Sequence, residues 1–179
     1  SYLDLSSANS INIARLIPQS FYYFNAYSKL NTDKKIVVSV PSGNFGNITA
    51  GILAKHMGLP ITHFIASTNA NKTVPKFLSS NNYVSSKSIE TISNAMDVGN
   101  PSNMKRIMNI YRNVENLKKE LNSWSFSDNE TKECILNTIQ KYNYLLDPHS
   151  AVGLLGLENF LKNNSDFVGL FLGTAHPSK

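Results

Sequence analysis

The sequence predicts an α/β fold in which helices flank a parallel sheet. An apolar run at residues 36–40 leads into a loop with two glycines three positions apart, and helical periodicity follows over residues 48–57. A second apolar run occupies residues 61–66. Strands that are apolar throughout are typical of parallel sheets covered on both faces, and a helix is the usual connection between two such strands. These three segments therefore predict a βαβ unit.

The segments on either side of this unit extend the same pattern. Residues 8–30 carry apolar residues at roughly helical spacing, and Pro18 is expected to kink or split that helix. Residues 72–79 suggest a short helix, whereas residues 80–101 are polar with little periodicity. A helical excursion is then expected at about residues 100–147.

The excursion contains two predicted helices, at about residues 102–121 and 128–145. Asp147-Pro148-His149 breaks the chain, and a helix at residues 150–162 precedes an apolar strand at residues 167–172. This alternation of apolar strands and helices keeps the chain in the α/β class.

The composition indicates a folded protein, with 41% hydrophobic and 16% charged residues among 179. No apolar run approaches the ~18 residues of a membrane span, so no membrane association is expected. The net charge is +5, but the lysines are scattered and form no basic stripe with aromatic residues. A solvated surface explains this charge better than a nucleic-acid partner.

Cys134 is the only cysteine. It cannot form an internal disulfide, which favours a reducing compartment, and we expect a cytoplasmic location. It lies in a polar helical pattern without a nearby histidine, which indicates a structural thiol rather than a nucleophile. No spacing of histidine, cysteine and carboxylate residues suggests a metal site.

The loop at residues 42–47, Ser-Gly-Asn-Phe-Gly-Asn, is the main candidate site. Glycine permits positive φ and close backbone approach, so such a loop can turn its amides toward one point. The helix that follows adds unbonded N–H groups and the positive end of its dipole, which together suit an anion such as a phosphate. The alternative is an ordinary turn between strand and helix that needs glycine for its geometry.

Four motifs in one order carry a resemblance to a known family. They are Ala8-Asn9-Ser10-Ile11-Asn12-Ile13-Ala14-Arg15, the segment Val40 to Asn47, Ser93-Asn94-Ala95-Met96-Asp97-Val98, and Gly173-Thr174-Ala175-His176-Pro177-Ser178-Lys179. In these motifs the sequence resembles the threonine synthases, which are pyridoxal-phosphate enzymes of fold type II. The resemblance implies two α/β domains with the cofactor between them, and a reaction that turns O-phosphohomoserine and water into threonine and phosphate.

By this resemblance, residues 1–179 are part of the pyridoxal-phosphate-binding catalytic region, an internal fragment of a longer chain. The cofactor phosphate is expected at the loop of Gly43, Asn44, Phe45, Gly46 and Asn47. The Thr174 hydroxyl is expected against the pyridine nitrogen of the cofactor. The ordinary alternatives are that Phe45 wedges the loop against the core and that Thr174 caps the turn after a strand.

The resemblance also implies that Asn9, Ser10 and Arg15 hold the substrate. An arginine recognises a phosphate with two permanently charged hydrogen bonds, which lysine cannot reproduce. The alternative is that Asn9 and Ser10 are helix caps and that Arg15 is a surface side chain.

Asp97, His149 and His176 lie within or beside the same motifs. Asp97 could instead cap a helix, and the two histidines could be structural. The family's Schiff-base lysine is expected upstream of residue 1, so no catalytic residue is assigned in this chain and the isolated fragment is expected to be inactive. Two alternatives stay open: a related pyridoxal-phosphate enzyme such as threonine dehydratase, and a non-catalytic protein that binds phosphate ligands.

Overall fold

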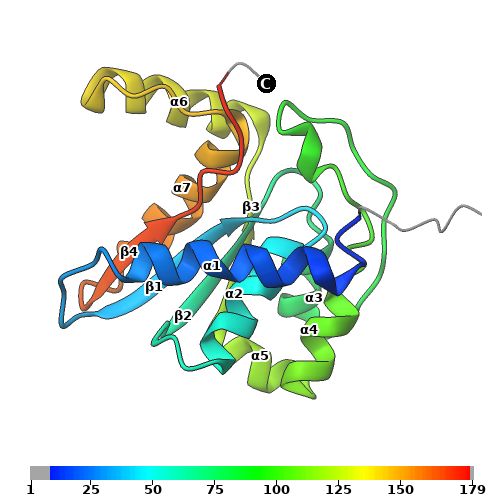
Figure 1. Ribbon diagram of the computed structural model, residues 1–179. Coiled ribbons are helices and arrows are strands. Elements are labelled where there is room, and N and C mark those ends of the chain that lie inside the picture. The colour runs from blue at the N-terminus through cyan, green and yellow to red at the C-terminus, as the bar shows by residue number, and fades with distance from the viewer. Residues whose placement is uncertain (1–8, 178–179) are drawn as a thin grey trace, which may run out of the picture.

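The computed structural model describes residues 9–177, in which four parallel strands form one sheet with helices on both faces (Figure 1). The strand order is β3-β2-β1-β4. The strands are β1 (Lys35–Pro41), β2 (His63–Thr68), β3 (Leu121–Ser125) and β4 (Phe167–Phe171). This architecture confirms the predicted α/β class with a parallel sheet flanked by helices.

The main helices are α1 (Leu16–Tyr27), α2 (Gly46–His56), α3 (Thr73–Ser80), α4 (Met104–Tyr111), α5 (Val114–Glu120), α6 (Asp128–Tyr142) and α7 (Pro148–Leu161). Two short 3-10 turns, η1 (Ile13–Arg15) and η2 (Asn94–Met96), lie in the loops. None of these helices between residues 9 and 177 is long and apolar enough to cross a membrane.

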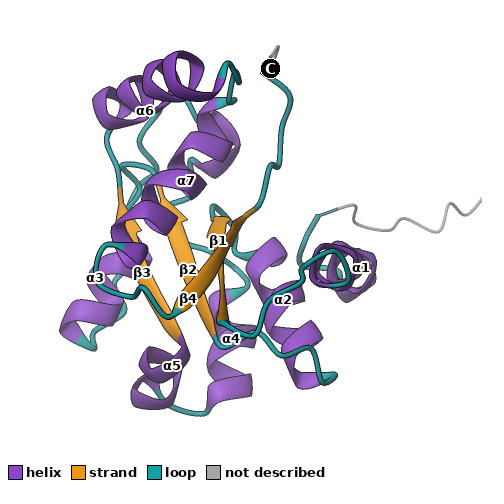
Figure 2. Ribbon diagram, turned by 90° about the vertical axis from the view of Figure 1, so that its left-hand side faces the viewer, coloured by secondary structure: helices purple, strands orange, loops and turns teal. Residues whose placement is uncertain are grey.

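The two faces of the sheet form separate cores because alternate residues of β1 point in opposite directions. Ile36, Val38 and Val40 lie in a large cluster with side chains of α1 to α5. Val37 lies on the other face, in a cluster that contains side chains of α7. Figure 2 shows α7 and α6 on the opposite side of the sheet from α1 and α2. The central strands β1 and β2 are buried along nearly their whole length, as their apolar sequences predict, whereas the edge strands β3 and β4 are mostly half-buried.

The predicted helical excursion contains an unpredicted strand. The helix expected over residues 102–121 is broken at Arg112, which has φ 66°, and Asn113 caps a new helix by accepting a hydrogen bond from the Asn116 amide. The chain then enters β3, which pairs with β2 at the edge of the sheet. Only Leu121 of this strand is buried. Its other residues need not be apolar, and the mixed polar sequence therefore did not predict a strand.

Pro18 does not interrupt the helix α1 (Leu16–Tyr27). The helix α1 begins at Leu16, which places Pro18 in its first turn. Amides of the first turn have no acceptor within a helix, so proline costs little there. The Asn12 side chain accepts from the Ala14 amide and caps the preceding 3-10 turn.

Candidate anion-binding site

A pocket of about 210 Å³ opens beside the β1–α2 loop, where the carboxyl ends of β1 and β4 meet. It brings together all the predicted site residues except Asn9. These are Ser10, Arg15, Gly43, Asn44, Phe45, Gly46, Asn47 and Thr174. Ligands of open parallel sheets bind at this edge. Because the volume is below the ~300 Å³ of small ligand sites, these residues cover only part of such a ligand.

The loop reaches α2 through a residue in the left-handed region. Phe45 has φ 62° and ψ 16° at the N-cap of α2, and its carbonyl accepts hydrogen bonds from both the amide and the hydroxyl of Thr49. The Phe45 ring is 1% exposed and lies in the core. Its ring therefore wedges the loop against the core, and only its backbone is available to a ligand.

The backbone amides of residues 43–47 are the feature of this pocket that could hold an anion. Within residues 9–177, no oxygen or nitrogen atom accepts a hydrogen bond from any of these five consecutive N–H groups. Gly43, Phe45 and Gly46 are buried, and a buried N–H without a partner costs about 1–3 kcal/mol. An anion at the amino end of α2 would accept from these amides and oppose the helix dipole. The loop therefore fits a phosphate group.

Glycine is required at two positions of this loop because neighbouring atoms pack closely against it. A Cβ at Gly43 would lie 2.7 Å from the Met96 Cα and 3.0 Å from the Ala95 carbonyl oxygen. A Cβ at Gly46 would lie 2.8 Å from the Ser10 Cβ. Ala95 and Met96 on one side and Ser10 on the other thus form walls of the loop.

The side chains of the two asparagines are occupied by the protein itself. Asn47 Nδ2 donates to the Pro41 carbonyl at 2.7 Å, and Asn47 Oδ1 accepts from the Ile48 amide. Asn44 Nδ2 donates to Ser10 Oγ at 2.7 Å, while Asn44 Oδ1 accepts from both the amide and the hydroxyl of Ser102. These side chains fix the shape of the loop and leave its backbone to the ligand.

Three residues that the sequence did not single out complete this network, namely Ser102, Asn103 and Arg106. Asn103 is 1% exposed and donates to the Asn44 carbonyl at 2.9 Å and to Ser10 Oγ at 3.2 Å. Arg106 donates to Asn103 Oδ1 and, at 3.1 Å, to the Ile11 carbonyl. In the sequence, these residues were marked only by a polar cluster before the amphipathic pattern of α4. Such clusters usually indicate a loop, so they did not point to a site.

The remaining predicted residues differ in their places. Arg15 and Thr174 are exposed and line the pocket. Asn9 is exposed outside the pocket lining, and its Oδ1 accepts from the Ile11 amide at 3.2 Å. His176 is exposed and does not line the pocket, whereas His149 is buried and does. Ala8, Ser178 and Lys179 of the terminal motifs lie outside the described residues.

Asp97 stabilises the loop of residues 93–98 through hydrogen bonds to its carboxylate. Its carboxylate accepts from the Thr91 amide at 3.0 Å, from the Thr91 hydroxyl at 2.7 Å and from Asn69 Nδ2 at 2.8 Å. Asn71 Nδ2 also donates to it, at 3.2 Å. Asp97 does not line the pocket, so its contacts hold η2 in place.

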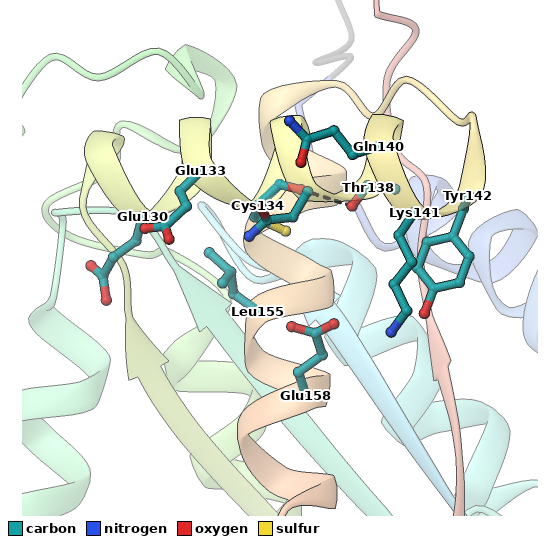
Figure 3. A pocket seen from close by; sticks show the side chains of 10 residues that line it. Glu130, Glu133, Cys134, Thr138, Gln140, Lys141, Tyr142, Leu155 and Glu158 are labelled. Carbon is teal, nitrogen blue, oxygen red and sulfur yellow. Dashed lines mark hydrogen bonds between the residues drawn. The ribbon is translucent and has the colours of Figure 1, made fainter.

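A larger hollow of about 630 Å³ lies between α6 and α7, away from every predicted site residue (Figure 3). Cys134 lines it, and burial, followed by the nearby Glu158, raises the pKa of this thiol to about 11. A thiol with such a pKa is protonated near neutral pH, in agreement with a structural role. Among residues 9–177, no group of three or more histidine, cysteine, aspartate or glutamate residues could hold a metal ion.

Comparison with known proteins gives consistent relatives, although no profile of a protein family matches the chain. Threonine synthase from Buchnera aphidicola subsp. Schizaphis graminum is 50% identical over 99% of this chain and 41% of its own length. The crystal structure of threonine synthase from Escherichia coli has a TM-score of 0.90 at 44% identity, covering 97% of this chain and 40% of that one.

A structure of threonine synthase from Brucella melitensis, described as bound to pyridoxal phosphate, also has a TM-score of 0.90. It is 33% identical and covers 98% of this chain and 43% of that one. This chain thus spans about two fifths of the length of its relatives. In both sequence and fold, the chain matches a segment of the threonine synthases along its whole length.

Proposed function

We propose that the protein containing this chain is a threonine synthase, a pyridoxal-phosphate-dependent lyase that converts O-phospho-L-homoserine and water into L-threonine and phosphate. The observation that carries this proposal is the row of five amides, residues 43–47, without acceptors in the described part of the chain. Identities of 46–50% to several threonine synthases across the chain support it. Residues 1–179 then form part of the catalytic region, and the unpaired Cys134 supports a cytoplasmic location.

The cofactor would be held at its phosphate by the amides of Gly43, Asn44, Phe45, Gly46 and Asn47 at the amino end of α2. Thr174 lines the same pocket, and its hydroxyl would contact the pyridine nitrogen. A neutral hydroxyl does not force that nitrogen to be protonated, so it would moderate the electron demand of the ring. When bound, pyridoxal phosphate supplies an electron sink that allows a proton to leave the substrate carbon.

The substrate would be held by the segment before α1. Arg15 stands at the exposed edge of the pocket, where a guanidinium can bind an incoming phosphate with two hydrogen bonds. Ser10 lines the pocket with Arg15 and Asn44, and Asn9 would contribute from just outside the lining. The contacts of Asn44 and Asn103 with Ser10 would keep the segment before α1 in a fixed position relative to the loop of residues 43–47.

No lysine lines this pocket within residues 9–177. The lysine that binds the cofactor and moves protons is therefore proposed to lie upstream of residue 1. The 179 residues alone are therefore expected to form no threonine.

The test is an assay of the purified full-length protein with O-phosphohomoserine and pyridoxal phosphate. Threonine and inorganic phosphate released in equal amounts would support the proposal. A protein that binds pyridoxal phosphate and releases neither product would be a non-catalytic binder, and one that releases ammonia from threonine would be a dehydratase. Replacement of the upstream lysine in the gene would also contradict the proposal.

A further inference from the structure

A buried pair of side chains, one of which lines the pocket, lies at the start of α7. Asp147 is 2% exposed and His149 is 4% exposed. Asp147 Oδ1 lies 2.9 Å from His149 Nδ1 and accepts from the amides of His149 and Ser150, and Oδ2 accepts from the Ser150 hydroxyl. The carboxylate therefore caps the helix and orients the imidazole at the same time.

The second ring nitrogen of His149 has a partner that fixes the tautomer. The Ala95 amide donates to His149 Nε2 at 3.2 Å. A backbone N–H can only donate, so Nε2 must carry a lone pair and the ring proton must be on Nδ1, facing Asp147. Both nitrogens are thus engaged, although the side chain lines the pocket. In this arrangement the ring has no nitrogen left to transfer a proton to a ligand.

The Ala95 amide belongs to the turn that supports the anion-binding loop. The Ala95 carbonyl oxygen and the Met96 Cα are the atoms that a Cβ at Gly43 would meet, at 3.0 and 2.7 Å. Asp97 anchors the far side of this turn to Thr91 and Asn69. His149 anchors its near side to α7, so a shift of the turn would release the backbone that packs on Gly43.

We propose that Asp147 and His149 are positioning residues, which hold η2 against Gly43 and thereby keep the amides of residues 43–47 aimed at the anion. The inference rests on the proposed function for the identity of that anion as the phosphate of pyridoxal phosphate. Neither residue acts as a general acid or base. The pair differs from an ordinary buried contact because one acceptor atom, His149 Nε2, holds the Ala95 amide and thereby the position of η2.

The experiment compares His149→Gln with His149→Leu in the full-length protein. Both variants remove the donor to Asp147, but Oε1 of glutamine can accept from the Ala95 amide in place of Nε2. The matched control is His63→Leu, which removes another half-buried imidazole that stacks on α7 at Phe160, away from the pocket. Hydrogen exchange of the Ala95 segment is measured without cofactor, and the Kd for pyridoxal phosphate is measured by fluorescence.

The expected result is faster exchange at Ala95 and an increase in Kd of about tenfold for His149→Leu, with values near wild type for His149→Gln and for the control. Unchanged exchange and Kd in His149→Leu, or equal losses in both His149 variants, would overturn the inference. If the leucine variant does not fold, nitrogen NMR of the wild-type protein, which identifies the tautomer of His149, tests the inference instead. A proton on Nδ1 supports the inference, and a proton on Nε2 overturns it. Failure of the wild-type protein to bind pyridoxal phosphate would instead count against the proposed function, because the exchange and tautomer measurements need no cofactor.

Discussion

Asn44 Nδ2 donates to Ser10 Oγ at 2.7 Å, which joins the anion-binding loop to the segment before α1 across 34 residues of sequence. Asn103 closes the arrangement by donating to Ser10 Oγ and to the Asn44 carbonyl. The residues proposed for the substrate and those proposed for the cofactor phosphate therefore share one hydrogen-bond network. A change in one segment should affect the other.

Replacing Asn103 with alanine tests this coupling. The variant removes two donors from a buried position and leaves Ser10 and the Asn44 carbonyl without them, at a cost of about 1–3 kcal/mol. We expect the KM for O-phosphohomoserine in the full-length enzyme to rise about tenfold. The control is Asn109→Ala, an exposed position on α4, the helix that begins directly after Asn103. Equal KM values for the two variants would contradict the coupling.

Replacing Gly43 with alanine tests the shape of the loop. The new Cβ would meet backbone atoms of Ala95 and Met96, so the loop must move. We expect the affinity for pyridoxal phosphate to fall at least tenfold, because the five amides would lose their common direction. Gly58→Ala is the control: with φ 105° and open space around it, this change costs about 1 kcal/mol of backbone strain far from the pocket. Fluorescence titration of both variants measures the affinity, and a cofactor affinity lowered equally in both would argue against a specific role of Gly43.

Replacing Arg15 with lysine tests phosphate recognition in the substrate. Lysine keeps the charge but loses the paired donors of the guanidinium. Steady-state kinetics of the full-length enzyme should show a KM for O-phosphohomoserine raised about tenfold, with the pyridoxal phosphate affinity unchanged. Arg112→Lys, an exposed position in the turn between α4 and α5, should leave both values unchanged. A normal KM in Arg15→Lys would indicate that Arg15 is only a surface side chain.

The Cys134 thiol should react slowly at ordinary pH. Because its pKa is raised to about 11, only about 0.1% is thiolate at pH 8. Alkylation by iodoacetamide in the folded protein should increase steeply between pH 9 and pH 11, whereas the urea-unfolded chain should show a midpoint at about pH 8.5. A folded-state midpoint near pH 8.5 would show that burial between α6 and α7 does not control this thiol. The same shift works against folding at alkaline pH, since the unfolded chain ionises first.

The local part of the fold could be predicted from the sequence. Consecutive residues determine the structure of β1, of β2 and of the glycine loop that follows β1. The helix after this loop begins within two residues of the predicted start. Strand β3 could not be predicted, because at the sheet edge it needs one partner and only Leu121 is buried. Its polar residues are as typical of a loop as of a strand.

The same distinction applies to the site. Short motifs in the sequence singled out the glycine loop and Thr174, which line one pocket, since glycine spacing and a strand end are local features. The roles of Asn103, Arg106 and His149 depend on contacts across 54 to 95 residues of sequence, which no periodicity encodes. For Asn44 and Asn47, the sequence indicated hydrogen-bonding side chains but could not show that their partners lie within the protein.

A crystal structure of the full-length protein with pyridoxal phosphate would test the central claim most directly. The account predicts phosphate oxygens about 2.7–3.2 Å from the backbone nitrogens of residues 43–47, with the pyridine nitrogen facing the Thr174 hydroxyl. A phosphate bound elsewhere, with these five amides turned toward protein acceptors, would contradict it.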